Sequence, residues 1–351
     1  MLQKLLSGLL ILVSSSQWIP VGGLLAQEAD VTIVFAADTL NIRECPGREC
    51  SVVASVSQGT ELILAEPEIA QDMANTNAWF KVALSDSAIE GYVHSSLTTA
   101  YHPNSWQGMP VTPRISAAML DVYRRGLAMG NNPQAFSIVG DCQNVSAYFL
   151  SDFEKPLQYD LGEHESLQET IDFFYGSFAR DRAAVRGGYN VAAVLSPMWA
   201  DPEQCEKGES PLACEYRLQQ PSFVLISMET WWEGQPVSTY EQYLRQVVEF
   251  WIDHGVVPIL ATKADNVEGD HSINTTIVRV AQDYDVPLWN FWRAVQPLPN
   301  HGLSDDEFHL TYGRPFFGDD GVMQTGWALR NLTALEALDS VRRGTLEIGA
   351  S

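Results

Sequence analysis

Cys142, Asp306 and His309 are the residues of this chain whose types and spacing best suit nucleophilic catalysis. Cys142 follows a short apolar run over residues 136–139 and a Gly-Asp pair, so it is expected where a strand passes into a helix. Such a turn exposes one side chain at the end of a sheet, with the free N–H groups of the helix start beside it. We expect a helix beginning over residues 144–150 to lower the pKa of the Cys142 thiol.

His309 and Asp306 supply the other two parts of a nucleophile–base–carboxylate triad. Their three-residue spacing lets one short turn present both side chains together. Asp305 and Glu307 compete with Asp306 for the role of orienting acid. The simpler interpretations are a surface histidine in a polar loop and a small buried cysteine that packs like a hydrophobic residue.

Together, the Gly-Asp-Cys turn and the late Asp-x-x-His resemble the SGNH (GDSL-type) hydrolase family, with Cys142 in place of the usual serine. The resemblance spans roughly residues 136–338. It implies an α/β fold with a parallel sheet sandwiched by helices and an ester hydrolase that uses Cys142, His309 and Asp306. A cysteine is a chemically competent nucleophile for this reaction.

Members of this family complete an oxyanion hole with a Gly and, later, an Asn. The loop over residues 186–190 matches the Gly position, with the Gly188 N–H as the candidate donor, although two glycines also suit an ordinary turn. The Asn position falls near Glu229 and Thr230, where no Asn stands. Asn190 or Thr230 is a candidate substitute. One missing donor typically costs about two to three orders of magnitude in rate.

Two further polar loops follow expected strands. Trp231 and Trp232 either stack on sugar rings or pack against the neighbouring lobe. Lys263 either binds an anionic substrate or is a solvated charge paired with Asp265. No metal or nucleotide motif is present, so neither cofactor is expected.

From residue 136 onward, apolar β-branched runs alternate with segments of helical spacing. This alternation predicts a parallel sheet with helices on both faces. Cys142, Glu229 and Thr262 each follow an expected strand, and sites in such sheets lie beyond the carboxyl ends of the strands. The expected strands cover residues 136–139, 222–228, 256–261 and 286–289, and the expected helices cover residues 115–129, 167–179, 239–254, 273–281 and 325–338.

Residues 28–99 show a different pattern, with short strands between turn residues. Strands are expected over residues 39–43, 51–56, 61–65, 79–82 and 91–94. The order of Leu-Asn-Ile-Arg, Trp-Phe-Lys-Val and Gly-Tyr-Val-His resembles a bacterial SH3-like barrel, which implies a glycan or cell-wall ligand. Residues 100–134 are expected to be a linker and leading helix, and residues 135–345 the α/β domain.

Residues 1–27 have one lysine and then an apolar run too short to span a bilayer comfortably, which favours a secretory signal peptide over a membrane anchor. We therefore expect a secreted protein with no transmembrane segment after cleavage. The formal net charge of −23 argues against a nucleic-acid partner, because phosphate binding requires clustered Lys and Arg.

The five cysteines are compatible with a secreted protein. Cys45 with Cys50, and Cys205 with Cys214, each bracket a short polar loop and are expected to form disulfides. Their spacings do not suit zinc. Cys142 remains as the unpaired thiol.

Three functions are compatible with these features. The first is a secreted esterase that acts on acyl esters, including O-acylated glycans or cell-wall material. The second is a non-catalytic SGNH-fold module that binds glycan or cell wall. In the third, Cys142 is a structural thiol that pairs with another chain, which requires an exposed sulfur on a flat surface.

Overall fold

A computed structural model describes residues 32–35, 39–57, 60–65, 78–84, 88–101, 105–231 and 235–346. The expected signal peptide and Trp232 lie outside these residues. No helix in the described segments is both long and apolar enough to cross a membrane.

The larger part of the molecule is built on a four-stranded sheet in the order β11-β10-β9-β8. All neighbouring strands in it run parallel. Its strands are β8 (Asn132–Gly140), β9 (Pro221–Ser227), β10 (Val257–Ala261) and β11 (Leu288–Trp289). Every residue of β9 and β10 is buried, as expected for a parallel sheet covered on both faces.

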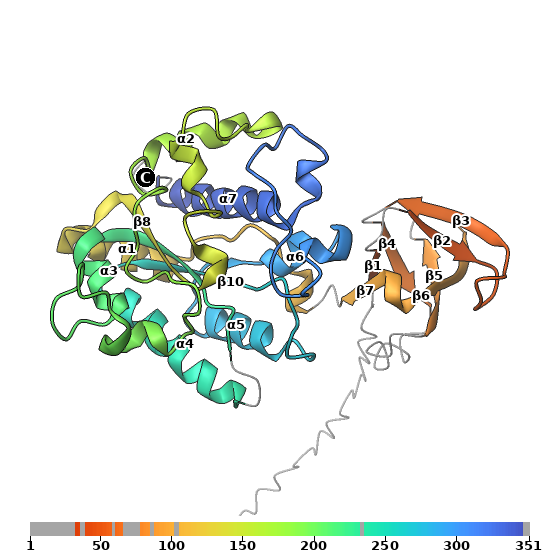
Figure 1. The fold of residues 1–351 in the computed structure, drawn as a ribbon, viewed down its shortest axis with the longest axis horizontal. Coiled ribbons are helices and arrows are strands. Elements are labelled where there is room, and N and C mark those ends of the chain that lie inside the picture. Colours follow the sequence, from red (N-terminus) through yellow and green to blue (C-terminus); the bar gives the residue numbers. More distant parts are fainter. Residues whose placement is uncertain are drawn as a thin grey trace, which may run out of the picture.

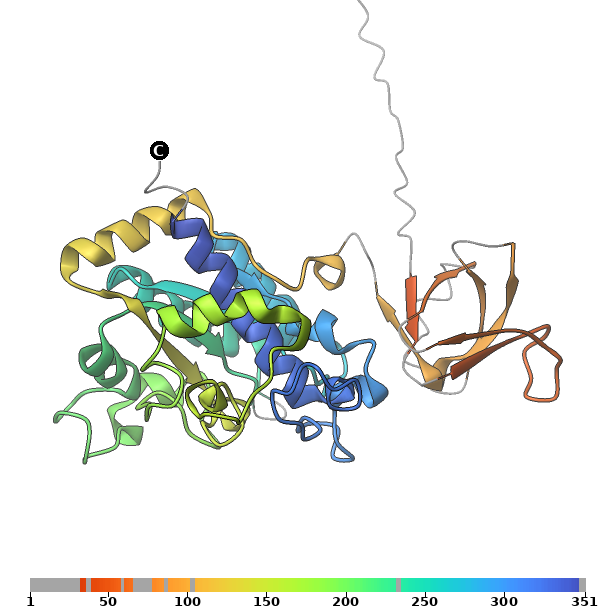
Figure 2. The ribbon, with the colours of Figure 1, turned by 90° about the horizontal axis from the view of Figure 1, so that it is seen from above.

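Helices cover both faces of this sheet, with α2 and α7 on one side and α4 and α5 on the other (Figure 1). Seen from above, α7 lies across the sheet close to α2 (Figure 2). The helices are α1 (Ala117–Met129), α2 (Gln168–Phe173), α3 (Pro211–Gln219), α4 (Val237–Asp253), α5 (Ser272–Asp283), α6 (Phe291–Val295) and α7 (Gly326–Leu346). The α/β class predicted from the sequence is confirmed.

Helix α1 begins at a serine cap and approaches the sheet closely. The Ser116 hydroxyl oxygen accepts a hydrogen bond from the Met119 N–H and donates one to the Asp285 carbonyl. A β-carbon at Gly126 would lie 2.0 Å from the carbonyl oxygen of Gly255. Glycine at position 126 therefore allows α1 to contact the turn between α4 and β10.

The expected strands of the α/β part match the observed ones within a few residues, but the helix expected from residue 144 is wrong. The chain forms only a three-residue 3-10 turn, η4 (Cys142–Asn144), and Val145 is already extended. A left-handed Leu150 then precedes a second 3-10 turn, η5 (Ser151–Glu154). The helix expected over residues 167–179 also ends early, at Phe173. Helix α3 was not predicted, although Ser210 and Pro211 mark its start.

The described residues between 32 and 101 contain a separate seven-stranded sheet in the order β3-β2-β6-β5-β4-β1-β7, with all paired strands antiparallel. The strands are β1 (Thr32–Phe35), β2 (Thr39–Arg43), β3 (Val52–Ser57), β4 (Glu61–Leu64), β5 (Trp79–Leu84), β6 (Glu90–His94) and β7 (Thr98–Tyr101). Its hydrophobic core, which includes Ile42 and Phe80, is distinct from the α/β core. The five predicted strands are all present, whereas β1 and β7 were not predicted.

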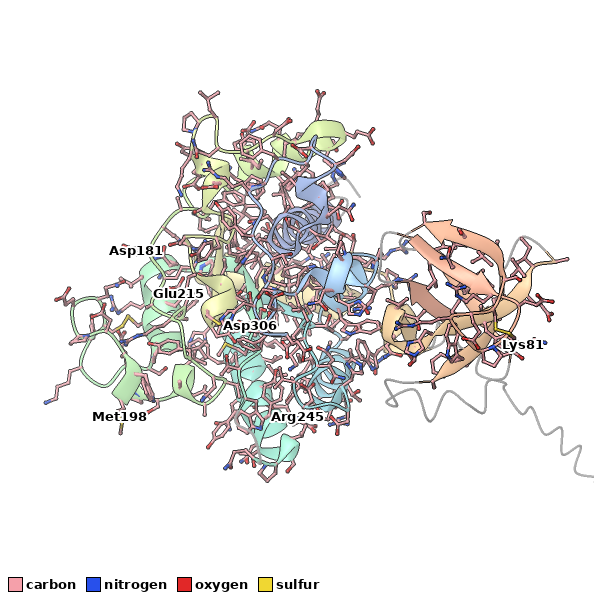
Figure 3. All side chains as sticks on the ribbon, turned by 45° about the vertical axis from the view of Figure 1, so that its right-hand side comes forward. Lys81, Asp181, Met198, Glu215, Arg245 and Asp306 are labelled. Carbon is pink, nitrogen blue, oxygen red and sulfur yellow. A yellow bond between two sulfur atoms is a disulfide. The ribbon has the colours of Figure 1, made fainter. Side chains whose placement is uncertain are left out.

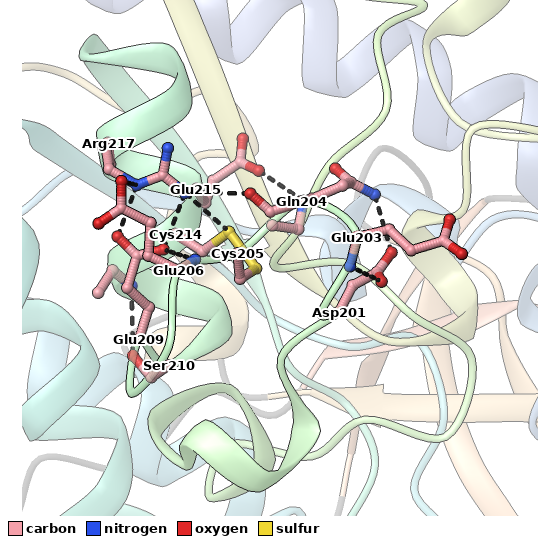
Figure 4. Close-up of a disulfide and its surroundings, with 12 residues drawn as sticks. Asp201, Glu203, Gln204, Cys205, Glu206, Glu209, Ser210, Cys214, Glu215 and Arg217 are labelled. Atoms are coloured by element: carbon pink, nitrogen blue, oxygen red, sulfur yellow. Dashed lines mark hydrogen bonds and ion pairs between the residues drawn. A yellow bond between two sulfur atoms is a disulfide. The ribbon is translucent and has the colours of Figure 1, made fainter.

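Both predicted disulfides are present, and Cys142 is the free cysteine of the described residues. Cys205–Cys214 joins a polar loop to α3 (Figure 4). Glu209 lies close to the two sulfur atoms, but its carboxylate accepts a hydrogen bond from Arg217 Nε at 2.6 Å. Since both sulfurs are in the disulfide, they offer no thiolate to a metal ion.

Candidate active site

Asp141 organises the turn that carries the thiol. Its Oδ1 accepts a hydrogen bond from the Gln143 N–H at 3.0 Å. Its Oδ2 accepts from the N–H groups of Glu229 and Thr230 at 2.9 and 2.8 Å. The fully buried carboxylate therefore fixes the turn after β8 against the loop after β9.

The neighbours of Cys142 stabilise its thiol rather than its thiolate. Burial and the negative charges of Asp141 and Glu229 raise the pKa of Cys142 to about 12. The backbone N–H groups of Cys142 and Gln143 act in the opposite direction, but they do not outweigh these effects. The expectation that a helix N-terminus lowers this pKa is therefore wrong, because no helix forms there and two carboxylates lie nearby.

A glycine of the 186–190 loop lies beside the thiol. The residues just before this loop run parallel to the end of β8: Val185 forms a parallel bridge with Gly140, and the Gly140 N–H donates to the Ala184 carbonyl at 3.1 Å. A β-carbon at Gly187 would lie 4.0 Å from Cβ of Cys142, whereas nothing lies within 4 Å of one at Gly188. Gly187 is therefore the residue of the pair that approaches the thiol, and Gly188 takes the left-handed conformation of the turn.

Asp306 and His309 form a tight pair on the loop between Leu303 and Leu310, which themselves form an antiparallel bridge. Asp306 is labelled in Figure 3. Its Oδ2 lies 2.6 Å from His309 Nδ1, and its Oδ1 accepts from the His309 N–H at 2.9 Å. These hydrogen bonds, with those of the Phe308 N–H and the Ser304 hydroxyl, lower the pKa of Asp306.

The pairing also decides the histidine tautomer. With Nδ1 donating to Asp306, a neutral His309 ring leaves Nε2 as an unprotonated acceptor. Asp305 and Glu307, the competing acids, are exposed on the same loop. Asp306 is thus the acid of the three that contacts His309.

One hydrogen bond brings the thiol turn and the histidine loop together. Gln143 Nε2 donates to the Phe308 carbonyl at 2.9 Å, which joins the residue after Cys142 to the residue before His309. Within the segments that the structure describes, no hydrogen bond links Cys142 Sγ to His309. Catalytic hydrogen bonds are often longer in a ligand-free enzyme and shorten when substrate is bound.

Glu229 stands where the family resemblance expects Asn, and its side chain is already engaged. Its carboxylate lies 3.0 Å from Nη2 of Arg330 on α7 and accepts from the Ser227 hydroxyl at 2.8 Å. Burial, partly offset by the Arg330 charge, raises the pKa of Glu229 to about 7.

Arg330 is fully buried beneath the site. Its Nε donates to the Gln143 carbonyl at 3.1 Å, so α7 supports the thiol turn from below. The guanidinium lies about 5 Å from three aromatic ring centres, those of Phe149, Trp289 and Phe291. The sequence offered no local signal for this arginine, because α7 is distant in the chain.

The two candidate substitutes for the missing Asn are both engaged in local structure. The Thr230 hydroxyl donates to Asp141 Oδ2 at 2.9 Å, so its proton points away from an oxyanion. Asn190 Oδ1 accepts from the N–H groups of Ala192 and Ala193, both at 3.0 Å. Each residue therefore stabilises a turn.

A cavity of about 490 Å³ adjoins the histidine loop and lies beyond the ends of β9 and β10. Trp231, half-buried and packed edge-on against Tyr240, lines it together with Phe308. Lys263 pairs with Asp265, as one interpretation predicted, but the lysine is 3% exposed and not solvated. Glu268, which the sequence analysis did not single out, is its second partner.

No family model matches the chain, and no curated protein matches its sequence. The psychrotrophic esterase EstA from Pseudoalteromonas sp. is similar at 15% identity, covering 60% of this chain and 97% of that one, with a TM-score of 0.36. A lipolytic protein assigned to the G-D-S-L family from Desulfitobacterium hafniense is similar at 13% identity, covering 58% and 99%, with a TM-score of 0.37. A GDSL-like lipase from Bacteroides thetaiotaomicron is similar at 14% identity, covering 63% and 98%, with a TM-score of 0.32. At these low scores, the likenesses carry no argument about the chemistry of this chain.

Proposed function

We propose that the chain is an ester hydrolase of the SGNH type that uses Cys142 as nucleophile, His309 as general base and Asp306 as the acid that orients the histidine. One observation carries the proposal: the Asp306–His309 pair is attached to the Cys142 turn by the bond from Gln143 to Phe308. The Cys142 turn follows the carboxyl end of β8, where sites in parallel sheets lie, and the Asp306–His309 pair comes from a distant part of the sequence.

The raised pKa of Cys142 decides the form of the mechanism. A resting thiolate is disfavoured, so His309 Nε2 takes the thiol proton as sulfur attacks the acyl carbon. The tetrahedral intermediate collapses to a thioester, and the alcohol leaves with the proton that His309 returns. A water molecule, deprotonated by His309, then cleaves the thioester, releases the carboxylic acid and restores the thiol.

The backbone N–H of Cys142 and the N–H groups of the Gly187 loop opposite are the donors for the developing oxyanion in this proposal, since the Gln143 N–H is already bonded to Asp141. No side-chain amide joins them at the Glu229 position, and we therefore expect a slow enzyme. The substrate is an acyl ester, with an O-acylated glycan or cell-wall polymer as the candidate class. We also propose that the protein is exported and that residues 28–99 bind a glycan.

The second candidate is a non-catalytic module that binds a glycan. This alternative is favoured by Glu229, which stands at the position of the expected oxyanion donor and is held there by its ion pair with Arg330. In this alternative the cavity beside Trp231 binds ligand, while Cys142 has no chemical role.

Hydrolysis of short-chain p-nitrophenyl esters and acetylated glycans by the purified protein separates the two candidates. We expect Cys142→Ala and His309→Ala each to lower kcat/KM by at least about 10³-fold, since the two residues act as a unit. Cys142→Ser is expected to retain activity, because His309 activates a hydroxyl in the same way. If wild type and Cys142→Ser are both inert while glycan binding persists, the binding module is the correct account.

The matched control is Asp305→Asn, which removes a charge next to Asp306 without touching His309. Its kcat/KM is expected to stay within about twofold of wild type, whereas Asp306→Asn should lose about 10²-fold or more through the wrong histidine tautomer. Equal losses in the two variants would contradict the assignment of Asp306.

A further inference from the structure

The cavity of about 490 Å³ contains a group of buried charges that the proposed ester chemistry does not use. Lys263 Nζ lies 2.6 Å from Asp265 Oδ1 and 2.5 Å from Glu268 Oε2. Lys263 and Asp265 are 3% and 0% exposed, so one ammonium and one carboxylate are held almost entirely away from water, and the Glu268 side chain is 17% exposed. With both carboxylates ionised, the group has one excess negative charge, since the remaining acid of the cavity, Glu229, is paired with Arg330.

Each carboxylate of this group also has an oxygen without a partner. Asp265 Oδ2 and Glu268 Oε1 are buried and accept no hydrogen bond from any described residue. A buried acceptor without a donor typically costs about 1–3 kcal/mol. The site therefore lacks hydrogen-bond donors and positive charge, and a ligand that brings both would satisfy it.

The rest of the cavity limits the class of ligand. Trp231 and Phe308 supply aromatic surface on the side of the His309 loop. Aromatic rings of this kind pack against the C–H faces of sugar rings and attract cations. A bare divalent cation fits less well, because the ammonium of Lys263 already lies between the two carboxylates.

We propose that this cavity is a binding subsite for an amino sugar, whose hydroxyl and ammonium groups donate to Asp265 and Glu268 while its ring packs on Trp231. The inference rests on the proposed function only in treating the sugar as the alcohol part of the ester. Phe308 both lines the cavity and accepts from Gln143, so a sugar bound there lies beside the thiol turn.

Calorimetric titration of the full chain with three tetrasaccharides tests the subsite: a glucosamine oligomer, a neutral glucose oligomer and an anionic galacturonate oligomer. We expect the glucosamine oligomer to bind at least about tenfold more tightly than the neutral one, with no detectable binding of the anionic one. Equal binding of the first two, or tighter binding of calcium or magnesium chloride than of the glucosamine oligomer, would overturn the proposal.

Matched variants separate a specific subsite from general attraction to an acidic protein. Glu268→Gln is expected to weaken glucosamine-oligomer binding about tenfold, whereas Asp305→Asn, which removes the same charge outside the cavity, should change it less than twofold. Val267→Lys adds a positive charge at an exposed position of the cavity wall and should also abolish binding without disturbing the core. Equal losses in Glu268→Gln and Asp305→Asn would contradict the inference.

Cys142→Ala keeps the two proposals distinguishable, because Cys142 does not line the cavity. If this variant binds the glucosamine oligomer but wild type has no esterase activity, the proposed function is refuted and the subsite is not. Esterase activity in wild type, without glucosamine-oligomer binding by either protein, would refute the subsite alone.

Discussion

Cys142 lies close to two carboxylates, those of Asp141 and Glu229, and both oppose ionisation of its thiol. Asp141 is needed for the turn, and Glu229 is held by Arg330 and Ser227. Neither charge can move away without breaking buried hydrogen bonds. At the scale of the residue, the site therefore favours a protonated nucleophile that requires a base at the moment of attack.

This charge distribution predicts slow alkylation of Cys142. Since its pKa is raised to about 12, its thiolate fraction, and with it the rate with iodoacetamide at pH 8, should be roughly 1,000-fold below that of a free cysteine. Because only the thiolate reacts, the rate should still increase with pH above pH 10. Mass spectrometry of the modified peptide measures the rate.

Glu229→Gln should accelerate the alkylation by removing one of the opposing charges, whereas Asp305→Asn should leave it unchanged. Reaction of wild-type Cys142 at the rate of a free thiol at pH 8 would contradict the predicted environment.

At the scale of elements, Asp141 couples the end of β8 to the loop after β9. Parallel strands share no hairpin that could hold their ends together, so side chains must supply the link. Gly140 belongs to the same junction, because a β-carbon there would lie 2.1 Å from Asn144 Nδ2, which donates to the Ser227 carbonyl. The two loops are therefore fixed to each other before any substrate is bound.

Removal of the Asp141 carboxylate should test this coupling. Asp141→Ala leaves the N–H groups of Gln143, Glu229 and Thr230 without their acceptor, and we expect it to lower the free energy of unfolding by about 3 kcal/mol. Urea denaturation followed by circular dichroism measures the loss. Asp305→Ala, an exposed control, should change it by less than about 0.5 kcal/mol. Equal stabilities of Asp141→Ala and wild type would contradict the proposed link.

At the scale of the whole molecule, the described residues contain two large hydrophobic cores that share no residue. One lies within the antiparallel sheet over residues 32–101 and the other around the parallel sheet. Each part also has its own disulfide, Cys45–Cys50 in the first and Cys205–Cys214 in the second. Two cores of this kind predict two units that unfold separately.

Hydrogen exchange with each disulfide removed in turn tests the separation. Cys45→Ala/Cys50→Ala should lose about 2 kcal/mol of stability, because the unfolded chain gains loop entropy. Mass spectrometry should show faster exchange for peptides over β2 and β5 and unchanged exchange for peptides over β9 and β10. Cys205→Ala/Cys214→Ala should give the opposite pattern, and acceleration in both units by either variant would contradict two units.

The local features of the protein could be predicted from its amino-acid sequence. Runs of β-branched residues predicted β9 and β10 to within one residue at each end. The short polar loops between cysteines predicted both disulfides. The three-residue spacing of Asp306 and His309 was enough to pair them, since both lie in one turn. These features depend on residues close together in the chain, which is why pattern alone is sufficient.

The electrostatics of the site could not be predicted from the sequence, because they depend on contacts that the fold creates. The turn at Cys142 was expected to begin a helix that lowers the thiol pKa, but it ends after three residues at the extended Val145, and Asp141 bonds across to Glu229 and Thr230. Arg330 reaches Glu229 from α7, a contact that no spacing along the chain reveals. Burial and charge at a site are sums over residues that the fold brings together, and they decide whether Cys142 is a thiol or a thiolate.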